Sequence, residues 1–127
     1  MNWTYITLIF FFIGILAFGF YAQDFIATTA VALDGQMLVV ERELNGGRHA
    51  HALKLIDGFL EDWDRTENKW SLFINHAEID NIEMSIAKIT QFIAKKEDAS
   101  ALAEIATVRS LLKHIPEREK LHPLNIL

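Results

Sequence analysis

The sequence contains no cysteine, only 2 prolines and only 6 glycines. Without cysteine, a disulfide framework and a thiolate metal site are both excluded. The chain also shows no alternating strand pattern, no Asn-Gly hairpin signal and no glycine-rich phosphate loop. These absences favour an all-α protein without a nucleotide-binding loop.

Positive charge is scarce, with 12 Lys and Arg against 17 Asp and Glu and a formal net charge of −5. Nucleic acids and anionic membrane surfaces both favour clustered cations, so the balance argues against either as a partner. Every charged side chain lies at or after Asp24. The chain therefore divides into an uncharged segment, residues 1–23, and a remainder, residues 24–127, the size of one small domain.

The uncharged segment is long enough to cross a bilayer. Trp3 to Ala22 is a run without charge that is rich in Ile, Leu and Phe. A helix of about 20 residues rises roughly 30 Å, which matches the hydrocarbon thickness. Trp3, Tyr5 and Tyr21 lie near its ends, where amphipathic rings prefer the interface. We predict a single-pass transmembrane anchor over residues 1–23.

Two other interpretations of this segment stay open, a cleaved signal peptide and a buried core helix. A signal peptide needs a basic start and a small-x-small cleavage site, and only Ala17-Phe18-Gly19 resembles one. Orientation follows from the flanks. Because no Lys or Arg occurs from Asp24 to Glu41, the positive-inside rule favours an extracytoplasmic C-terminal domain at the cell membrane.

Four rows of apolar residues at helical spacing follow. Asn45-Gly46-Gly47 should end the first helix and Pro116 the last, while Asp98 or Ser100 should cap the fourth. The pattern predicts an all-α fold, in which the transmembrane helix continues into an antiparallel three- or four-helix bundle. The rows are Ile26, Leu33, Met37, Val40, Leu44; Leu53, Ile56, Leu60, Trp63, Glu67, Trp70, Ile74; Ile79, Ile82, Ile86, Ile89, Ile93; and Ala101, Ile105, Val108, Leu112, Ile115.

A corner is expected at residues 75–78, because Ile74 and Ile79 are about 140° out of phase on one helix. Asn75 would cap the next helix, and Glu78 would lie in its first turn, where the helix dipole favours an acid. This capping role explains the polar residues of the corner without chemistry.

The same corner supports a second interpretation. His76, Asp80 and Glu83 would share one helix face and could bind a divalent cation or form a general base in a metal-dependent hydrolase. The signal is unspecific, because there is no HExxH motif and the single Glu-x-x-His, from Glu119 to His122, lacks the second copy that a di-iron bundle needs. We therefore expect no metal, no cofactor and no catalytic residue.

Other polar residues carry weaker signals. His49 and His51 point about 160° apart on a helix and are expected to be solvated. An acidic run is interleaved with Trp63 and Trp70, and is either a solvated face or a surface for a basic partner. The two tryptophans are expected in the core. The run comprises Asp57, Glu61, Asp62, Asp64 and Glu67.

The order of several motifs resembles the bacterial domain-of-unknown-function family numbered 4363. The motifs are W-x6-W-x2-F-I-N-H-x-E-I-D-N-I-E at 63–83, A-L-A-E-I at 101–105, L-x-H-I-P-E at 112–117 and a terminal N-I-L. The resemblance implies a small single-anchor helical protein of Gram-positive bacteria without an assigned activity. Unlike such anchors, this sequence lacks basic N-terminal residues. The family motif falls on Trp70, His76, Glu78, Asp80, His114 and Pro116.

These observations lead to a functional hypothesis. We expect a membrane-tethered helical accessory or protein-interaction module, with an integral membrane protein as its partner. The alternative is the metal-binding or hydrolytic domain centred on His76.

Overall fold

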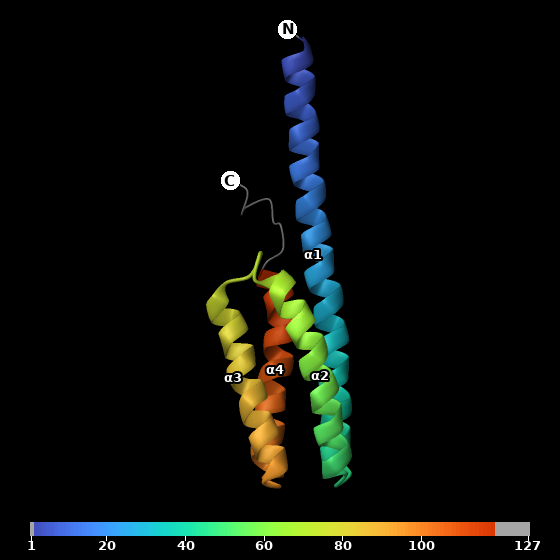
Figure 1. Cartoon of the computed structure of the whole chain (residues 1–127), viewed down its shortest axis with the longest axis vertical. Coiled ribbons are helices and arrows are strands. Elements are labelled where there is room, and N and C mark those ends of the chain that lie inside the picture. Colours follow the sequence, from blue (N-terminus) through green and yellow to red (C-terminus); the bar gives the residue numbers. More distant parts are fainter. Residues whose placement is uncertain (1, 119–127) are drawn as a thin grey trace.

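The computed structural model describes residues 2–118, which form four α-helices and contain no strand. Helix α1 spans Asn2–Asn45, α2 spans His49–Trp70, α3 spans His76–Ala94 and α4 spans Asp98–Arg118. The part of α1 from Ala22 onwards and the other three helices run alternately up and down beside one another (Figure 1). The predicted all-α bundle is confirmed in its four-helix form.

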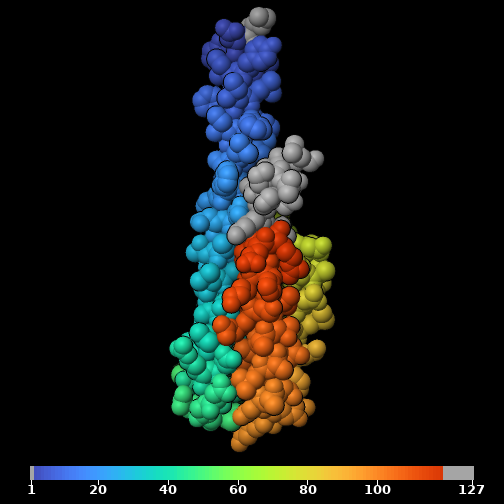
Figure 2. All heavy atoms as spheres, turned by 180° about the vertical axis from the view of Figure 1, so that it is seen from behind, coloured from blue at the N-terminus to red at the C-terminus, as the bar shows by residue number. Residues whose placement is uncertain are grey.

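Helix α1 has two halves with different surroundings. Residues 2–21 are exposed apart from the half-buried Gly19, and they extend beyond the bundle in both views (Figure 1 and Figure 2). From Ala22 onwards, one side of the helix is buried against α2 and α4, through Ala22, Ile26, Ala30, Leu33, Met37, Val40 and Leu44. The predicted continuation of the apolar helix into the bundle without a break is therefore confirmed.

The turns at the far end of the bundle connect α1 to α2 and α3 to α4. Gly47 has φ +74, a left-handed conformation that glycine adopts without strain, and Arg48 N donates to Glu43 O at 2.9 Å. The prediction that Asn45-Gly46-Gly47 ends the first helix is therefore confirmed. The prediction of an Asp98 or Ser100 cap is wrong, because Asp98 is already the first residue of α4.

At the opposite end, a short loop connects α2 to α3 near the exposed half of α1. Asn75 Oδ1 accepts a hydrogen bond from Ala77 N at 2.9 Å, and Glu78 lies in the first turn of α3, as predicted. The corner itself begins earlier than predicted, because α2 ends at Trp70 and Ile74 is a loop residue. Ile74 is nevertheless buried, since the loop folds back over the end of the core.

The buried face of α2 is rotated from the predicted row. Ala52 and Phe59 are fully buried, whereas Leu53, Leu60 and Glu67 are half-buried. The helix has an apolar surface wider than one row, and its packing against α1 selects one edge of that surface. The rows of α3 and α4 are buried as predicted.

The prediction that Pro116 ends the last helix is also wrong, since α4 includes this residue and continues to Arg118. A proline inside a helix removes one backbone hydrogen bond. Two residues from the end of the described helix, that loss affects a single turn and does not divide the helix.

Candidate binding groove between α2 and α3

Trp63 and Trp70 lie on the buried side of α2, where the sequence predicted them. Their rings meet edge to face with centroids 5.7 Å apart, and the exposed fractions are 4% and 0%. Trp70 Nε1 donates to Thr29 Oγ1 of α1 at 2.8 Å. The Trp63 indole N–H is buried without a hydrogen-bond partner among the described residues. The two tryptophans therefore differ in that the N–H of Trp70 is paired and the N–H of Trp63 is not.

Trp63 forms part of a groove of about 570 Å³ between α2 and α3. From α2 it is lined by Leu60, Trp63, Asp64 and Glu67, and from α3 by Glu83, Ile86, Ala87, Thr90 and Gln91. In Figure 1, α4 lies behind and between these two helices. Its surface is thus apolar along the centre and acidic at one end.

The acidic end of the groove brings two carboxylates of different helices near each other. Burial raises the pKa of Glu67, and the negative charges of Glu83 and Asp64 raise it further. No ion pair joins α2 to α3 anywhere in residues 2–118. A hydrogen bond with Glu83 raises the pKa of Glu67 as well. The two carboxyl groups therefore face each other without a cation from residues 2–118, and a bound cation would favour the ionised form of both.

The corner residues His76, Asp80 and Glu83 are all exposed on α3. Within residues 2–118 there is no group of three or more His, Asp or Glu side chains placed to hold a metal ion. Glu78 instead forms an ion pair with Arg118 of α4, at 2.7 Å. Asn75 and Glu78 thus have the capping and first-turn positions that were predicted for them without any chemical role.

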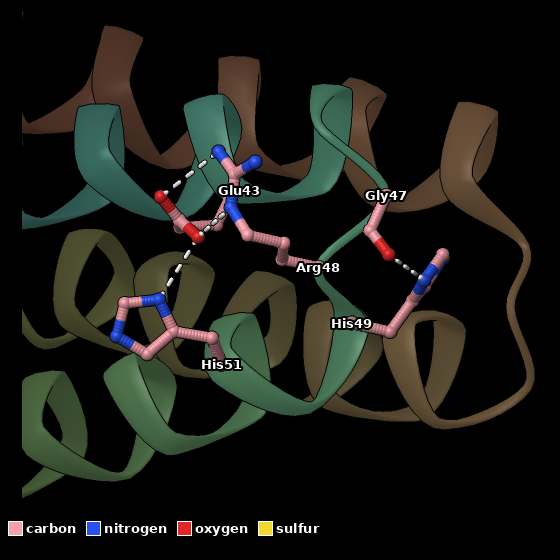
Figure 3. Close-up of polar contacts among 5 residues, drawn as sticks. All are labelled: Glu43, Gly47, Arg48, His49 and His51. Carbon is pink, nitrogen blue, oxygen red and sulfur yellow. Dashed lines mark hydrogen bonds and ion pairs between the residues drawn. The ribbon is translucent and has the colours of Figure 1, made fainter.

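His49 and His51, next to the turn between α1 and α2, are not simply solvated as predicted. His49 Nε2 lies 2.6 Å from Asp98 Oδ1 of α4, and His51 Nδ1 lies 2.9 Å from Glu43 Oε2 of α1. Arg48 Nε also donates to Glu43, at 2.5 Å, so that carboxylate receives two partners (Figure 3). Hydrogen bonds from Arg48 and then His51 lower the pKa of Glu43 to about 2.

Sequence reasoning missed these contacts, because His49 and Asp98 are 49 residues apart and nothing local connects them. The prediction that the two histidines point in different directions is consistent with their separate partners. These contacts tie α2 to its neighbours at the far end of the bundle.

Comparison with known families identifies the family of this chain. Residues 20–126 match the family described as "Domain of unknown function (DUF4363)", which is most of the sequence. The chain belongs to the DUF4363 family. No curated protein and no solved structure matches it. The resemblance seen in the sequence motifs is thereby confirmed at the level of the family.

The motif positions of this DUF4363 chain are spread over the bundle. Trp70 is in the core, and His76 and Asp80 are on the surface of α3. His114 is exposed on α4, with Nδ1 3.8 Å from Glu117 Oε2. The structure does not gather them into one site. The Glu119 to His122 motif and the terminal N-I-L lie outside the described residues.

One residue of the sequence pointed to the groove between α2 and α3. It is Glu67, the single acid in an otherwise apolar row of α2. Glu83 lies across the groove from Glu67, but the helical spacing associates Glu83 with His76 instead. Pairing the two required the relative position of α2 and α3, which only the structure provides.

Proposed function

We propose that this protein is a membrane-tethered helical module whose bundle binds another membrane protein. The observation that carries the proposal is the exposed and uncharged half of α1, residues 2–21. Trp3, Phe10 and Phe11 have exposed fractions of 81%, 73% and 69%. A continuous apolar surface of this kind is unfavourable in water and favourable in a bilayer.

The alternatives for this segment are less consistent with the described contacts. A core helix would be covered by protein, whereas this half of α1 is exposed. A cleaved signal peptide would be independent of the mature fold, whereas the Phe18 ring packs on Phe73 of the α2–α3 loop, with centroids 5.6 Å apart. The uncleaved anchor is therefore the interpretation that the contacts favour.

The α2–α3 loop supports a bundle that stands directly on the membrane surface. Leu72 has an exposed fraction of 76%, and its neighbour Phe73 contacts the apolar half of α1. A loop at that height lies at the bilayer interface once residues 2–21 are inserted. Leu72 would then be buried in the interface instead of exposed to water.

The proposed orientation places the bundle on the extracytoplasmic side. The support is the absence of Lys and Arg from Asp24 to Glu41, because such residues hold a flank in the cytoplasm. The proposed role is that of an accessory or interaction module, since the described residues contain a groove without a metal-binding group.

Labelling of introduced cysteines tests insertion and orientation together, because the chain has no cysteine of its own. Ser110→Cys places a thiol on the exposed side of α4, and Gly14→Cys places one in the apolar half of α1, where a Cβ meets no neighbour within 4 Å. With a membrane-impermeant maleimide on intact cells, we expect Ser110→Cys to react and Gly14→Cys to stay unlabelled.

Two results would contradict the proposal. Labelling of Ser110→Cys only after lysis would place the bundle in the cytoplasm. Extraction of the protein from membranes by carbonate would show that residues 2–21 are not inserted, because burial of uncharged residues does not depend on pH or salt.

A further inference from the structure

We propose that the groove between α2 and α3 binds an amphipathic helical segment of the partner protein, which places a Lys or Arg side chain between Glu67 and Glu83. The inference rests on the proposed function and specifies its binding site. Apolar side chains of the same segment would pack on Trp63 and Ile86. The partner is therefore recognised by one cation next to an apolar face.

The dimensions of the groove fit a short helix. Its lining runs from Leu60 to Glu67 on α2 and from Glu83 to Gln91 on α3. At 1.5 Å per residue these stretches are about 10 to 13 Å long, or roughly two turns of a helix. A volume of about 570 Å³ accommodates several side chains. Laying an apolar helix face into such a groove is a common mode of peptide recognition.

The charges of the bundle indicate that the missing group is a cation. Across the α1–α4 contact, Arg109 donates to Asp34 at 2.8 Å and to Glu41 at 3.2 Å. Across the α3–α4 contact, Lys88 lies 3.8 Å from Glu104. The acids between α2 and α3 have no such partner in residues 2–118, and the positive charge would come from outside the chain.

A metal ion does not account for the site. The described residues hold no set of three or more His, Asp or Glu side chains that could bind one. Lys or Arg can pair with two carboxylates while its aliphatic stem packs on apolar surface. The apolar floor of the groove is suited to such a stem and gives no advantage to a hydrated ion.

Trp63 supplies an observation that is independent of charge. Its side chain lines the groove, is 4% exposed and has an N–H without a partner among the described residues. Nearly all buried donors in proteins are paired, so an unpaired one suggests a missing acceptor. Because this nitrogen is itself covered by protein, a carbonyl or hydroxyl of the bound segment would reach it only if the side chains that line the groove shift on binding.

The position of the groove favours a partner that is itself in the membrane. Trp70 pairs with Thr29, seven residues after Ala22, the first buried residue of α1. Seven residues rise about 10 Å, and Glu67 is one turn further from the membrane. A segment in the groove therefore lies roughly 15 Å from the end of the uncharged helix, within reach of a chain leaving the bilayer.

The probe for this inference is a designed helical peptide with a leucine face and one central lysine. Binding is measured by fluorescence anisotropy to the full-length protein in nanodiscs of phosphatidylcholine, which is uncharged overall. We expect the peptide to bind, and replacement of its lysine by norleucine to weaken binding at least tenfold. Glu67→Gln and Glu83→Gln should each weaken it about tenfold.

Glu61→Gln is the matched control, because it removes the same charge from an exposed position of α2 outside the groove. Its affinity for the lysine peptide should equal that of the parent. The Trp63 indole N–H resonance should shift on binding, while that of Trp70 should not. Circular dichroism of each variant checks that the bundle is folded.

Several outcomes would overturn the inference. They are absence of binding, equal binding of the norleucine peptide, and an equal loss of affinity in Glu61→Gln. Self-association that disappears in Glu83→Gln, without peptide binding, would show that a second copy occupies the groove. Failure of the chain to insert into membranes would refute the proposed function and with it this inference, whereas an inserted chain that does not bind the peptide refutes only this inference.

Discussion

The hydrogen bond from Trp70 to Thr29 fixes the C-terminal end of α2 to α1, and its contribution to stability can be predicted. The distance is 2.8 Å and the indole is fully buried. Thr29→Val removes the acceptor and keeps the branched shape, which leaves the N–H buried and unpaired. Such a donor costs about 1 to 3 kcal/mol. Trp70→Phe removes the donor and part of the ring, and should cost about 2 to 4 kcal/mol.

The double variant separates the hydrogen bond from these other losses. It has neither donor nor acceptor, so its cost should be smaller than the sum of the single costs by about 1 kcal/mol. Thr66→Val is the control, since Thr66 is half-buried and, within residues 2–118, its hydroxyl bonds only to Asp62 O of the same helix, at 2.8 Å. It should cost less than Thr29→Val.

The measurement is urea unfolding of the full-length protein in detergent micelles, followed by circular dichroism of the bundle. Strictly additive costs for Thr29→Val and Trp70→Phe would mean that the two side chains do not interact. Equal costs for Thr29→Val and Thr66→Val would lead to the same conclusion. Either result would refute the assigned contact between α1 and α2.

Three further predictions concern charge. The pKa of Glu43 is lowered to about 2, so its contacts stabilise the fold above pH 4.5 and are lost as the pH falls toward 2. In Glu43→Gln, the melting temperature should therefore depend less on pH over that range than it does in the parent. Burial raises the pKa of Glu67, so its ionisation on raising the pH above 4.5 destabilises the fold, and Glu67→Gln should melt higher than the parent at pH 7. Arg109→Met removes the bonds to Asp34 and Glu41 and should cost about 1 to 2 kcal/mol in urea unfolding.

The helices were predictable because their signals are local. The row from Ile79 to Ile93 and the turn at Gly47 each depend on a few neighbouring residues, and both are found as predicted. The rotation of α2 was not predictable. Leu60 and Phe59 are equally apolar, and only the position of α1 determines that Phe59 is the one that becomes fully buried.

The candidate site was predictable only in part. The acidic run around Trp63 suggested a basic partner, and the structure places Asp64 and Glu67 of that run in the groove. The link from Glu67 to Glu83 depends on how far apart α2 and α3 stand, which no local pattern encodes. For the same reason the contact from His49 to Asp98 could not be foreseen.

The unbroken helix α1 couples its exposed apolar half, residues 2–21, to the groove in rotation as well as in distance. Because each residue turns a helix by about 100°, a given side of residues 2–21 always faces the same direction relative to α2 and α4. One residue inserted at Tyr21 would swing the bundle by about 100°, whereas seven would add about 10 Å and nearly restore its azimuth. A partner that contacts both residues 2–21 and the groove would therefore respond differently to a change in the rotation of the bundle and to a change in the length of the helix. The chain contains no hinge between Asn2 and Asn45 to absorb the difference.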